Sequence, residues 1–294
     1  MAIKILIGGS PYTHWSIAQK NNRETTAEGI GWELFKNYLI AKEKFKPDLF
    51  LYENNKSAAQ AIKDQIAFEL GVGTDPKARF TYINSALVSA QNRQRFYVTN
   101  FGDIEQPEDR GILLKDILES CEPCRNEKAY CLDANYFKGD NLSNFNKQSG
   151  QRLSVAEPVN ITADGKSQCL RATCYKDGIR NLVANDVDRK TCVAEPVCVA
   201  ERGRPVYQVL NGQITIKNKQ YPITLQDGYY IVRKLTVTEC CRLQTMPDDY
   251  CKAVSATQGY KGLGNGWTAE VIIHLLDHAL KDVPRDEEIV VLSL

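Results

Sequence analysis

The sequence predicts an α/β fold in which a β-rich region of about a hundred residues interrupts a sheet with parallel strands. Over the first hundred residues, short apolar runs alternate with stripes of apolar residues at helical spacing. Between about 121 and 232 the chain is rich in cysteine and polar residues and carries short β-type runs, and after Arg233 the α/β pattern returns. The expected divisions are therefore 1–120, 121–232 and 233–294, the first and last belonging to one domain.

The elements of the first division follow from local patterns. Apolar residues at 4–7 predict a strand that runs into two glycines, and a helical stripe at 28–45 ends where Pro47 stops it. Ser57 is the expected N-cap of a second helix. The elements expected here are strands at 4–7, 48–52, 80–88 and 94–99 and helices at 28–45 and 57–70.

The later elements are predicted in the same way. The segment Val155-Ala156-Glu157-Pro158-Val159 recurs at 193–197, which favours a local duplication of a strand or turn over a repeat protein. Thr236 begins a helix in the returning α/β pattern. The elements expected after residue 200 are strands at 214–216, 229–232 and 288–294 and helices at 236–244 and 268–280.

Composition limits the class of protein. Of the 294 residues, 43% are hydrophobic and 25% charged, with a formal net charge of +1, which is typical of a soluble globular protein. No stretch reaches the roughly 18 apolar residues of a membrane span, and the N-terminal run does not resemble a signal peptide. We therefore expect a cytoplasmic protein with no membrane partner. The charge balance neither favours nor excludes a local basic cleft for nucleic acid.

The ten cysteines are expected to be reduced thiols. Cys121 and Cys124 have the spacing of a metal knuckle, and Cys131 could add a third ligand, but structural zinc needs four ligands. Scattered thiols are the favoured interpretation, so no metal is predicted.

Three polar clusters follow predicted strands, where an α/β sheet places reactive groups. The loop from Gly8 to Ser16 is either a cleft-lining loop or an ordinary strand–helix connection. Glu53-Asn54 places a poorly solvated carboxylate at a strand end, suited to proton donation or hydrogen bonding, or else starts a surface loop. In the third cluster, Arg93 and Arg95 occupy alternate positions of an extended segment and would therefore share one face. Two guanidinium groups on one face suit phosphate or carboxylate recognition, or else belong to a solvated edge strand.

Together these clusters resemble the motifs of the DNA (cytosine-5) methyltransferases, particularly phage and bacterial restriction-modification enzymes whose motifs are similar to those of the animal de novo enzymes. Any one motif is weak, but the five occur in family order over about residues 1–280. The matching segments are Gly8-Gly9-Ser10-Pro11-Tyr12, Glu53-Asn54, Gln91-x-Arg93-x-Arg95, 233–248 and the Gly-Asn segment 258–267.

The resemblance implies a Rossmann-like methyltransferase sheet with a target-recognition insert at about 121–232. It also implies that a cytosine of duplex DNA is flipped out of the helix, that Glu53 holds the base, that Arg93 orients it and that Arg95 braces the site. Tyr12 stands at the nucleophile position. The residues that the resemblance assigns to DNA are Ser16, Gln19, Gln91 and Arg93, and those assigned to S-adenosylmethionine are Pro11, Asn265, Gly266 and Trp267.

Tyr12 is the first departure from the family, because the residue after Pro11 should be a cysteine. An ordinary thiol, with a pKa of about 8.5, is a few per cent thiolate at neutral pH, whereas a phenol, with a pKa of about 10, is only about 0.1% ionised. The phenol ring is also bulkier and would fill space that a flipped base needs. Methyl transfer is therefore expected to be lost or very slow.

The second departure concerns the cofactor. Family members carry a Gly-rich loop and an acidic ribose-binding residue before the catalytic loop, and neither is found before Gly8. The apolar segment 288–294 is similar to the strand that leads into such a loop, or else is a coincidental apolar tail. The motif order therefore predicts a circular permutation, with the cofactor-binding half on a companion chain or lost from a truncated or inactivated relative.

Three functions remain open at this point. The favoured one is a cytosine-5 methyltransferase fragment from a prokaryote or phage-infected host, with compromised catalysis. The second is a non-catalytic DNA-binding or regulatory subunit of a split methyltransferase. The third, an unrelated α/β enzyme using Tyr12, His14 or Ser16, is disfavoured because no Gly-x-Ser-x-Gly elbow surrounds Ser16.

Overall fold

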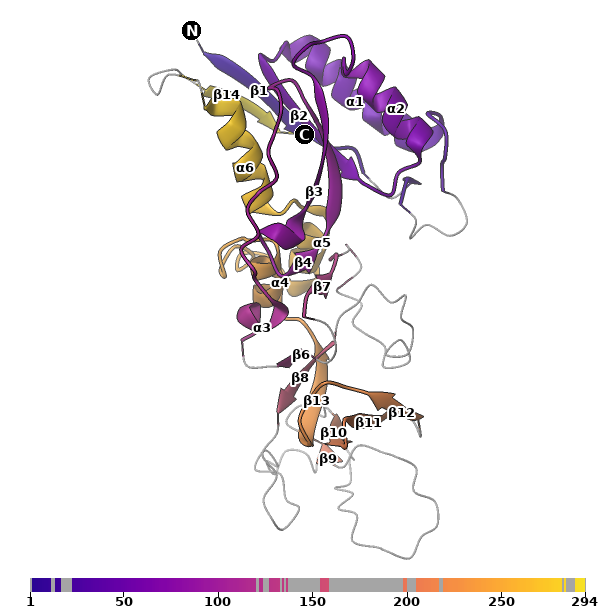
Figure 1. Ribbon diagram of the computed structural model, residues 1–294, viewed down its shortest axis with the longest axis vertical. Helices are drawn as coiled ribbons and strands as arrows, with labels where there is room; N and C mark the ends of the chain where they lie inside the picture. Colours follow the sequence, from indigo (N-terminus) through magenta and orange to yellow (C-terminus); the bar gives the residue numbers. More distant parts are fainter. Residues whose placement is uncertain are drawn as a thin grey trace, which may run out of the picture. The chain divides into compact units, whose positions relative to one another are not determined.

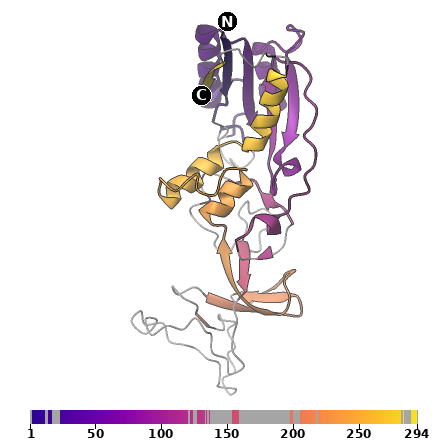
Figure 2. The ribbon, with the colours of Figure 1, turned by 90° about the vertical axis from the view of Figure 1, so that its left-hand side faces the viewer.

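The chain forms two compact units (Figures 1 and 2). The first comprises Met1–Val88, Arg93–Arg110 and Ala269–Leu294, and the second comprises Ser89–Asn92 and Gly111–Thr268. The sequence-based boundaries near residues 120 and 232 remain predictions. The computed structural model describes residues 2–11, 14–16, 23–119, 122–123, 127–132, 134, 136, 154–158, 198–199, 205–216, 219–281, 283 and 289–293.

The first unit contains a five-stranded mixed sheet in the order β14-β1-β2-β5-β3. Strand β1 is parallel to both β14 and β2, whereas β5 is antiparallel to β2 and β3. The strands are β1 (Ile3–Gly8), β2 (Leu49–Asn55), β3 (Arg79–Asn84), β5 (Gln94–Thr99) and β14 (Ile289–Ser293). The predicted α/β class is confirmed, and the segment near the C-terminus forms the predicted strand.

The expectation of a sheet with parallel strands is wrong for β5. Only residues 85–93 connect β3 to β5, and part of this connection is the 3-10 turn Ser85–Leu87. A crossover to a parallel strand needs roughly a dozen or more residues, so the chain can only return antiparallel. Strand β3 is correspondingly shorter than the predicted 80–88.

Two helices cover one face of this sheet, and α6 (Ala269–Leu280) lies on the other (Figures 1 and 2). Helix α1 (Gly29–Phe45) ends at Lys46, which adopts a left-handed conformation with φ 48° before Pro47. Helix α2 (Gln60–Glu69) begins later than predicted, and the assignment of Ser57 as its N-cap is wrong. The Ser57 amide instead donates to the Asn55 side chain at 3.1 Å, in a turn that precedes the helix.

The core of the first unit joins α1 and α2 to the sheet. Phe35 and Tyr38 of α1 pack with their rings edge-on against Tyr52 of β2, with centroids 5.1 and 5.0 Å apart. Ile62 and Ile66 of α2 are fully buried in the same cluster. This packing fixes the last part of β2, which carries the Glu53-Asn54 motif.

The second unit contains a β-sheet and a group of helices. Its larger sheet is antiparallel, in the order β12-β11-β10-β13-β8-β6 with β9 on β10, and β4 forms a separate parallel pair with β7. The predicted strands at 214–216 and 229–232 lie within β11 and β13. The strands are β4 (Gln91–Asn92), β6 (Glu122–Pro123), β7 (Ala129–Tyr130), β8 (Ser154–Pro158), β9 (Cys198–Val199), β10 (Pro205–Leu210), β11 (Gln213–Ile216), β12 (Lys219–Pro222) and β13 (Gly228–Lys234).

The helices of the second unit are α3 (Leu114–Ile117), α4 (Val237–Leu243) and α5 (Ala256–Asn265). The predicted start at Thr236 is confirmed: its hydroxyl accepts from the Glu239 amide at 3.1 Å, and the Glu239 carboxylate accepts from the Thr236 amide at 2.7 Å. This reciprocal capping box satisfies two amides that a helix start leaves without partners.

Several sequence-based predictions fall outside the described residues: Tyr12, Gln19, Cys121, Cys124 and the second copy of the repeated segment at 193–197. Cysteines 131, 240, 241 and 251 are free thiols. Within the described ranges, no three His, Cys, Asp or Glu side chains are grouped to hold a metal ion, and no helix has the length and apolar character needed to cross a bilayer.

Candidate active site at the ends of β1 and β2

The ends of β1 and β2 meet at one edge of the sheet, because the two strands are parallel and Gly8 pairs with Tyr52. The next residues, Gly9 and Glu53, approach each other closely. A Cβ atom on Gly9 would lie 2.5 Å from the main-chain oxygen of Glu53 and 3.1 Å from its carboxylate Oε2. Only glycine allows this approach, which explains the second glycine of the motif.

The closeness of these strand ends can be tested by adding one methyl group. We expect Gly9→Ala to lower the free energy of unfolding by about 1–3 kcal/mol, because the strand ends must separate. Gly262→Ala adds the same methyl to α5 where nothing lies within 4 Å, and should raise that free energy by up to about 1 kcal/mol through helix propensity. Urea unfolding measures both variants. A Gly9→Ala protein as stable as the parent would contradict the close approach.

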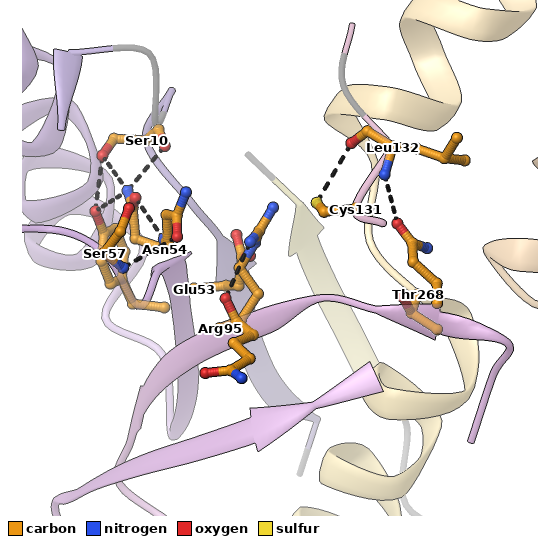
Figure 3. A network of polar contacts seen from close by, with 12 residues as sticks. Ser10, Glu53, Asn54, Ser57, Arg95, Cys131, Leu132 and Thr268 are labelled. Atoms are coloured by element: carbon orange, nitrogen blue, oxygen red, sulfur yellow. Dashed lines mark hydrogen bonds and ion pairs between the residues drawn. The ribbon is translucent and has the colours of Figure 1, made fainter. Parts of the chain in front are cut away.

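Asn54 ties the loop after β1 to β2. Its side-chain Nδ2 lies 3.0 Å from the Ser10 carbonyl, 3.0 Å from the Ser10 hydroxyl and 3.1 Å from the Tyr52 hydroxyl (Figure 3). The Ser10 and Tyr52 hydroxyls are 2.7 Å apart. Burial raises the pKa of Tyr52 well above its ordinary value, although the hydrogen bonds from Ser10 and Asn54 act in the opposite direction. The phenol therefore stays protonated and the network is neutral.

Glu53 is held by a buried ion pair. Its Oε1 lies 2.8 Å from Nε of Arg95, and the two side chains are only 11% and 5% exposed (Figure 3). The pairing of β2 with β5 brings Arg95 opposite Asn55 and Tyr97 opposite Glu53. Burial, followed by the nearby Glu53 charge, raises the pKa of Tyr97, so this phenol is also neutral. The pair thus presents one fixed, largely buried carboxylate, which suits orientation of a polar ligand.

The predicted arginine pair is not on a solvated edge. Arg93 and Arg95 are 2% and 4% exposed, and β5 lies between β2 and β3 inside the sheet. The alternative of a solvated edge strand is therefore wrong. The Arg93 amide donates to the Asn84 side chain at 3.1 Å, which fixes the connection that precedes β5.

Gln91, from the same motif, takes part in a buried polar network of the second unit. Its Nε2 donates to the Leu243 carbonyl at 3.2 Å, and its Oε1 accepts from the Leu132 amide at 2.8 Å. Gln244 extends this network, since its Nε2 donates to the Leu263 carbonyl and its Oε1 accepts from the Thr268 hydroxyl at 3.0 Å. The network joins three sequence motifs that are far apart in the chain: the Gln-x-Arg-x-Arg segment, the 233–248 segment and the end of the Gly-Asn segment.

The loop after β1 is anchored by a residue that the motifs did not single out. The Glu24 carboxylate accepts from the Trp15 indole at 3.1 Å and from the Gly31 amide in the first turn of α1 at 3.1 and 3.2 Å. A side chain on Gly31 would collide with both Trp15 and Glu24. The pair of glycines Gly29 and Gly31 at a helix start was the available sequence signal. A carboxylate at this position also interacts favourably with the helix dipole.

The remaining predicted site residues are placed as follows. Ser16 is buried and Pro11 is exposed, both in the loop after β1. In the second unit, Asn265 is the exposed last residue of α5, Gly266 is its C-cap and Trp267 is half-buried. Asn265 thus offers an exposed amide, and Trp267, two residues later, a partly exposed indole.

The family model "C-5 cytosine-specific DNA methylase" matches residues 89–281. No curated protein matches the chain. Among solved structures, the Entamoeba histolytica methyltransferase EhMeth is 12% identical with a TM-score of 0.46, covering 96% of this chain and 78% of that one. The S. pombe Dnmt2 methyltransferase is 11% identical with a TM-score of 0.46, covering 94% and 77%. A Spodoptera frugiperda DNMT2 mutant is 15% identical with a TM-score of 0.48, covering 94% and 79%.

The family match includes the Gln-x-Arg-x-Arg, 233–248 and Gly-Asn segments, which are the three motifs that the buried network joins. It spans more than half of the 294 residues. The chain therefore belongs to the C-5 cytosine-specific DNA methylase family.

Proposed function

We propose that this protein is a DNA cytosine-5 methyltransferase by descent, whose site holds a cytosine flipped out of duplex DNA. The observation that carries the proposal is the buried Glu53–Arg95 pair at the ends of adjacent strands, in a chain of this family. The guanidinium fixes one carboxylate oxygen, so the carboxyl group can direct hydrogen bonds to the edge of a pyrimidine. Arg93 orients the base or a neighbouring phosphate, and Ser16, Gln19 and Gln91 contact the DNA.

S-adenosylmethionine, when bound, supplies the methyl group of this reaction. Pro11, Asn265, Gly266 and Trp267 are the residues that we assign to it. The chain's own contribution is to hold the base against Glu53 in a region that excludes water, where a fixed charge acts more strongly than in bulk solvent.

Tyr12 makes the methyl transfer itself doubtful, because a phenol is a poor substitute for a thiol as nucleophile. The same residue favours a second candidate, a non-catalytic DNA-binding or regulatory subunit of a split methyltransferase. Both candidates retain Glu53, Arg93 and Arg95, and they differ in whether any methyl group reaches DNA.

Exposed apolar side chains on β14 favour the existence of a cofactor-binding half, on the same or a companion polypeptide, that covers this strand. Ile289, Val290 and Val291 are 42%, 38% and 53% exposed, so consecutive apolar side chains are accessible on both faces of this strand. Parallel strands are ordinarily covered on both faces. We assign the cover to the half that carries the Gly-rich cofactor loop.

The experiment that tests the proposed function is DNA binding. We expect duplex DNA containing cytosine to be shifted at roughly micromolar protein in low salt, with affinity falling as salt screens and replaces phosphate contacts. A mobility-shift titration at low and moderate salt measures this. Arg95→Gln leaves Glu53 without its guanidinium and should weaken discrimination of a central cytosine over thymine. Absence of any shift in low salt would overturn both candidate functions.

A further inference from the structure

Two lysines and a tyrosine form a cluster near the end of β2, on the face of the sheet that α2 covers. The strand register places Glu53 and Arg95 on the opposite face. Lys56 follows β2, Lys63 lies in α2 and Tyr82 lies in β3. The ammonium nitrogens of Lys56 and Lys63 lie 5.6 and 5.5 Å from the centroid of the Tyr82 ring. Lys63 Nζ also donates to the Tyr82 hydroxyl at 3.3 Å and lies 3.5 Å from the Lys56 carbonyl. Two positively charged groups therefore lie close to the same phenol ring.

These charges have no partner of opposite sign within the described part of the chain. Lys63 is only 9% exposed, and the acceptors around it are a carbonyl and a hydroxyl. Lys56 is exposed and donates to the neutral Gln94 amide at 2.7 Å. Among the described residues, no carboxylate lies within 4.0 Å of either ammonium. Burying the Lys63 ammonium beside a second positive charge, with no counter-charge, costs free energy. The cluster therefore favours binding of an anion from outside the chain.

Gln94 connects the cluster to the end of β5 that carries Arg95. The Gln94 carbonyl accepts from Arg95 Nη1 at 3.0 Å and from the Lys56 amide at 3.4 Å. Its side chain meanwhile orients Lys56. The phenolic proton of Tyr82 remains free to be donated, since the oxygen accepts from Lys63. An anion bound here would therefore meet two ammonium groups and one hydroxyl donor at the same end of β2 as Glu53, on the other face of the sheet.

We propose that Lys56, Lys63 and the Tyr82 hydroxyl bind a phosphodiester group of the DNA strand whose base is held at Glu53. This inference rests on the proposed function. Lysine ammonium groups and tyrosine hydroxyls are common partners of DNA phosphates, and such contacts position the duplex without reading its sequence. The site would thus set the register of the strand at the catalytic edge of the sheet.

The test compares the salt dependence of duplex binding between lysine variants. Lys56→Gln and Lys63→Gln should each weaken binding severalfold, equally on all sequences, and lower the slope of log affinity against log salt by up to about 1. Lys36→Gln is the matched control, because Lys36 is paired with Glu33 at 2.7 Å on α1 and its loss should leave the slope unchanged. Lys56 is exposed, so its variant remains informative if Lys63→Gln unfolds.

A second arm identifies the ligand as a DNA phosphate. A single neutral methylphosphonate replaces each phosphate around the central cytosine in turn. At one position this replacement should weaken DNA binding by the parent protein, whereas the same replacement should not further weaken binding by Lys56→Gln. If the parent binds DNA and Lys56→Gln behaves like Lys36→Gln at every position, the phosphate site is wrong while the proposed function stands. A third outcome would also overturn the proposal. Inorganic phosphate at matched ionic strength would protect the parent and Lys36→Gln, but not Lys56→Gln, from thermal unfolding, and no methylphosphonate position would be coupled to Lys56. The site would then bind a free anion and not a DNA phosphate. If the parent binds no DNA, the proposed function fails first.

Discussion

Arg233→Met should lower the free energy of unfolding by about 3–5 kcal/mol, the cost of leaving a buried carboxylate unpaired. Glu239 is fully buried and receives two hydrogen bonds from the Arg233 guanidinium, at 2.8 and 2.9 Å. It also accepts from the amides of Thr236 at 2.7 Å and Glu119 at 3.2 Å. The carboxylate therefore joins β13, the start of α4 and the segment at residue 119 within the second unit. Removing its guanidinium partner should destabilise all three.

The same pair makes stability depend on pH. Burial alone would raise the pKa of Glu239, but the hydrogen bonds from Arg233, Thr236 and Glu119 hold that pKa below its ordinary value. The resulting stabilisation is fully present above the unfolded-state pKa of about 4.3 and is lost as pH falls through the lower folded-state value. Urea unfolding between pH 7 and pH 3 measures this effect. The free energy of unfolding of the parent should fall over this range, whereas that of Arg233→Met, which already lacks the ion pair, should change less.

Arg242→Met is the matched control for this prediction. Arg242 makes a bidentate pair with Asp248 at 2.8 and 2.6 Å, but both side chains are substantially exposed. Water screens such a pair, so its loss should cost far less than the loss of Arg233. Equal effects of the two substitutions would contradict the importance given to burial.

Much of the fold followed from the sequence where the local signal was strong. The apolar run before Gly8-Gly9, the proline after α1 and the Thr236 capping residue each act within a few residues, and the structure confirms all three. The direction of β5 was not predicted, because it depends on the length of its connection to β3 rather than on its own residues. Ser57 was misread as a cap because Asn55 two residues earlier captures its amide in a turn.

The candidate site was only partly predictable. Glu53 and Arg95 were both identified, but their contact depends on strand pairing between β2 and β5. Gln91 and Arg93 are two residues apart, yet they belong to different compact units, which no periodicity in the motif reveals. Glu24 was missed because its partners are an indole and a backbone amide, contacts that leave no spacing pattern in the sequence.

Tyr12→Cys, supplied with the cofactor-binding half, should convert an inert site into one that forms a covalent complex with DNA. The introduced thiolate would add to C6 of the flipped base, and C5 would then receive the methyl group. With 5-fluorocytosine at the target, the fluorine on C5 cannot leave as a proton does, so the bond from sulfur to C6 persists. We expect no complex for the parent protein and none for Tyr12→Cys without the added half.

Glu53→Gln in the restored protein is the informative second substitution. An amide can hydrogen-bond but cannot accept or donate the proton as a carboxyl group does, so covalent complex formation should be abolished or slowed by at least about 100-fold. DNA binding in low salt should be retained, since phosphate contacts supply most of it. Lys36→Gln in the same background should trap DNA at the unaltered rate, because that side chain pairs with Glu33 on the surface of α1.

The measurement that tests the central claim most directly is therefore the denaturing-gel shift of 5-fluorocytosine duplex by Tyr12→Cys protein complemented with the cofactor-binding half. A protein–DNA band that needs the thiol, Glu53 and the methyl donor together is the result predicted for a cytosine-5 methyltransferase site. Normal DNA binding with no covalent band would contradict it and leave a non-catalytic DNA-binding subunit.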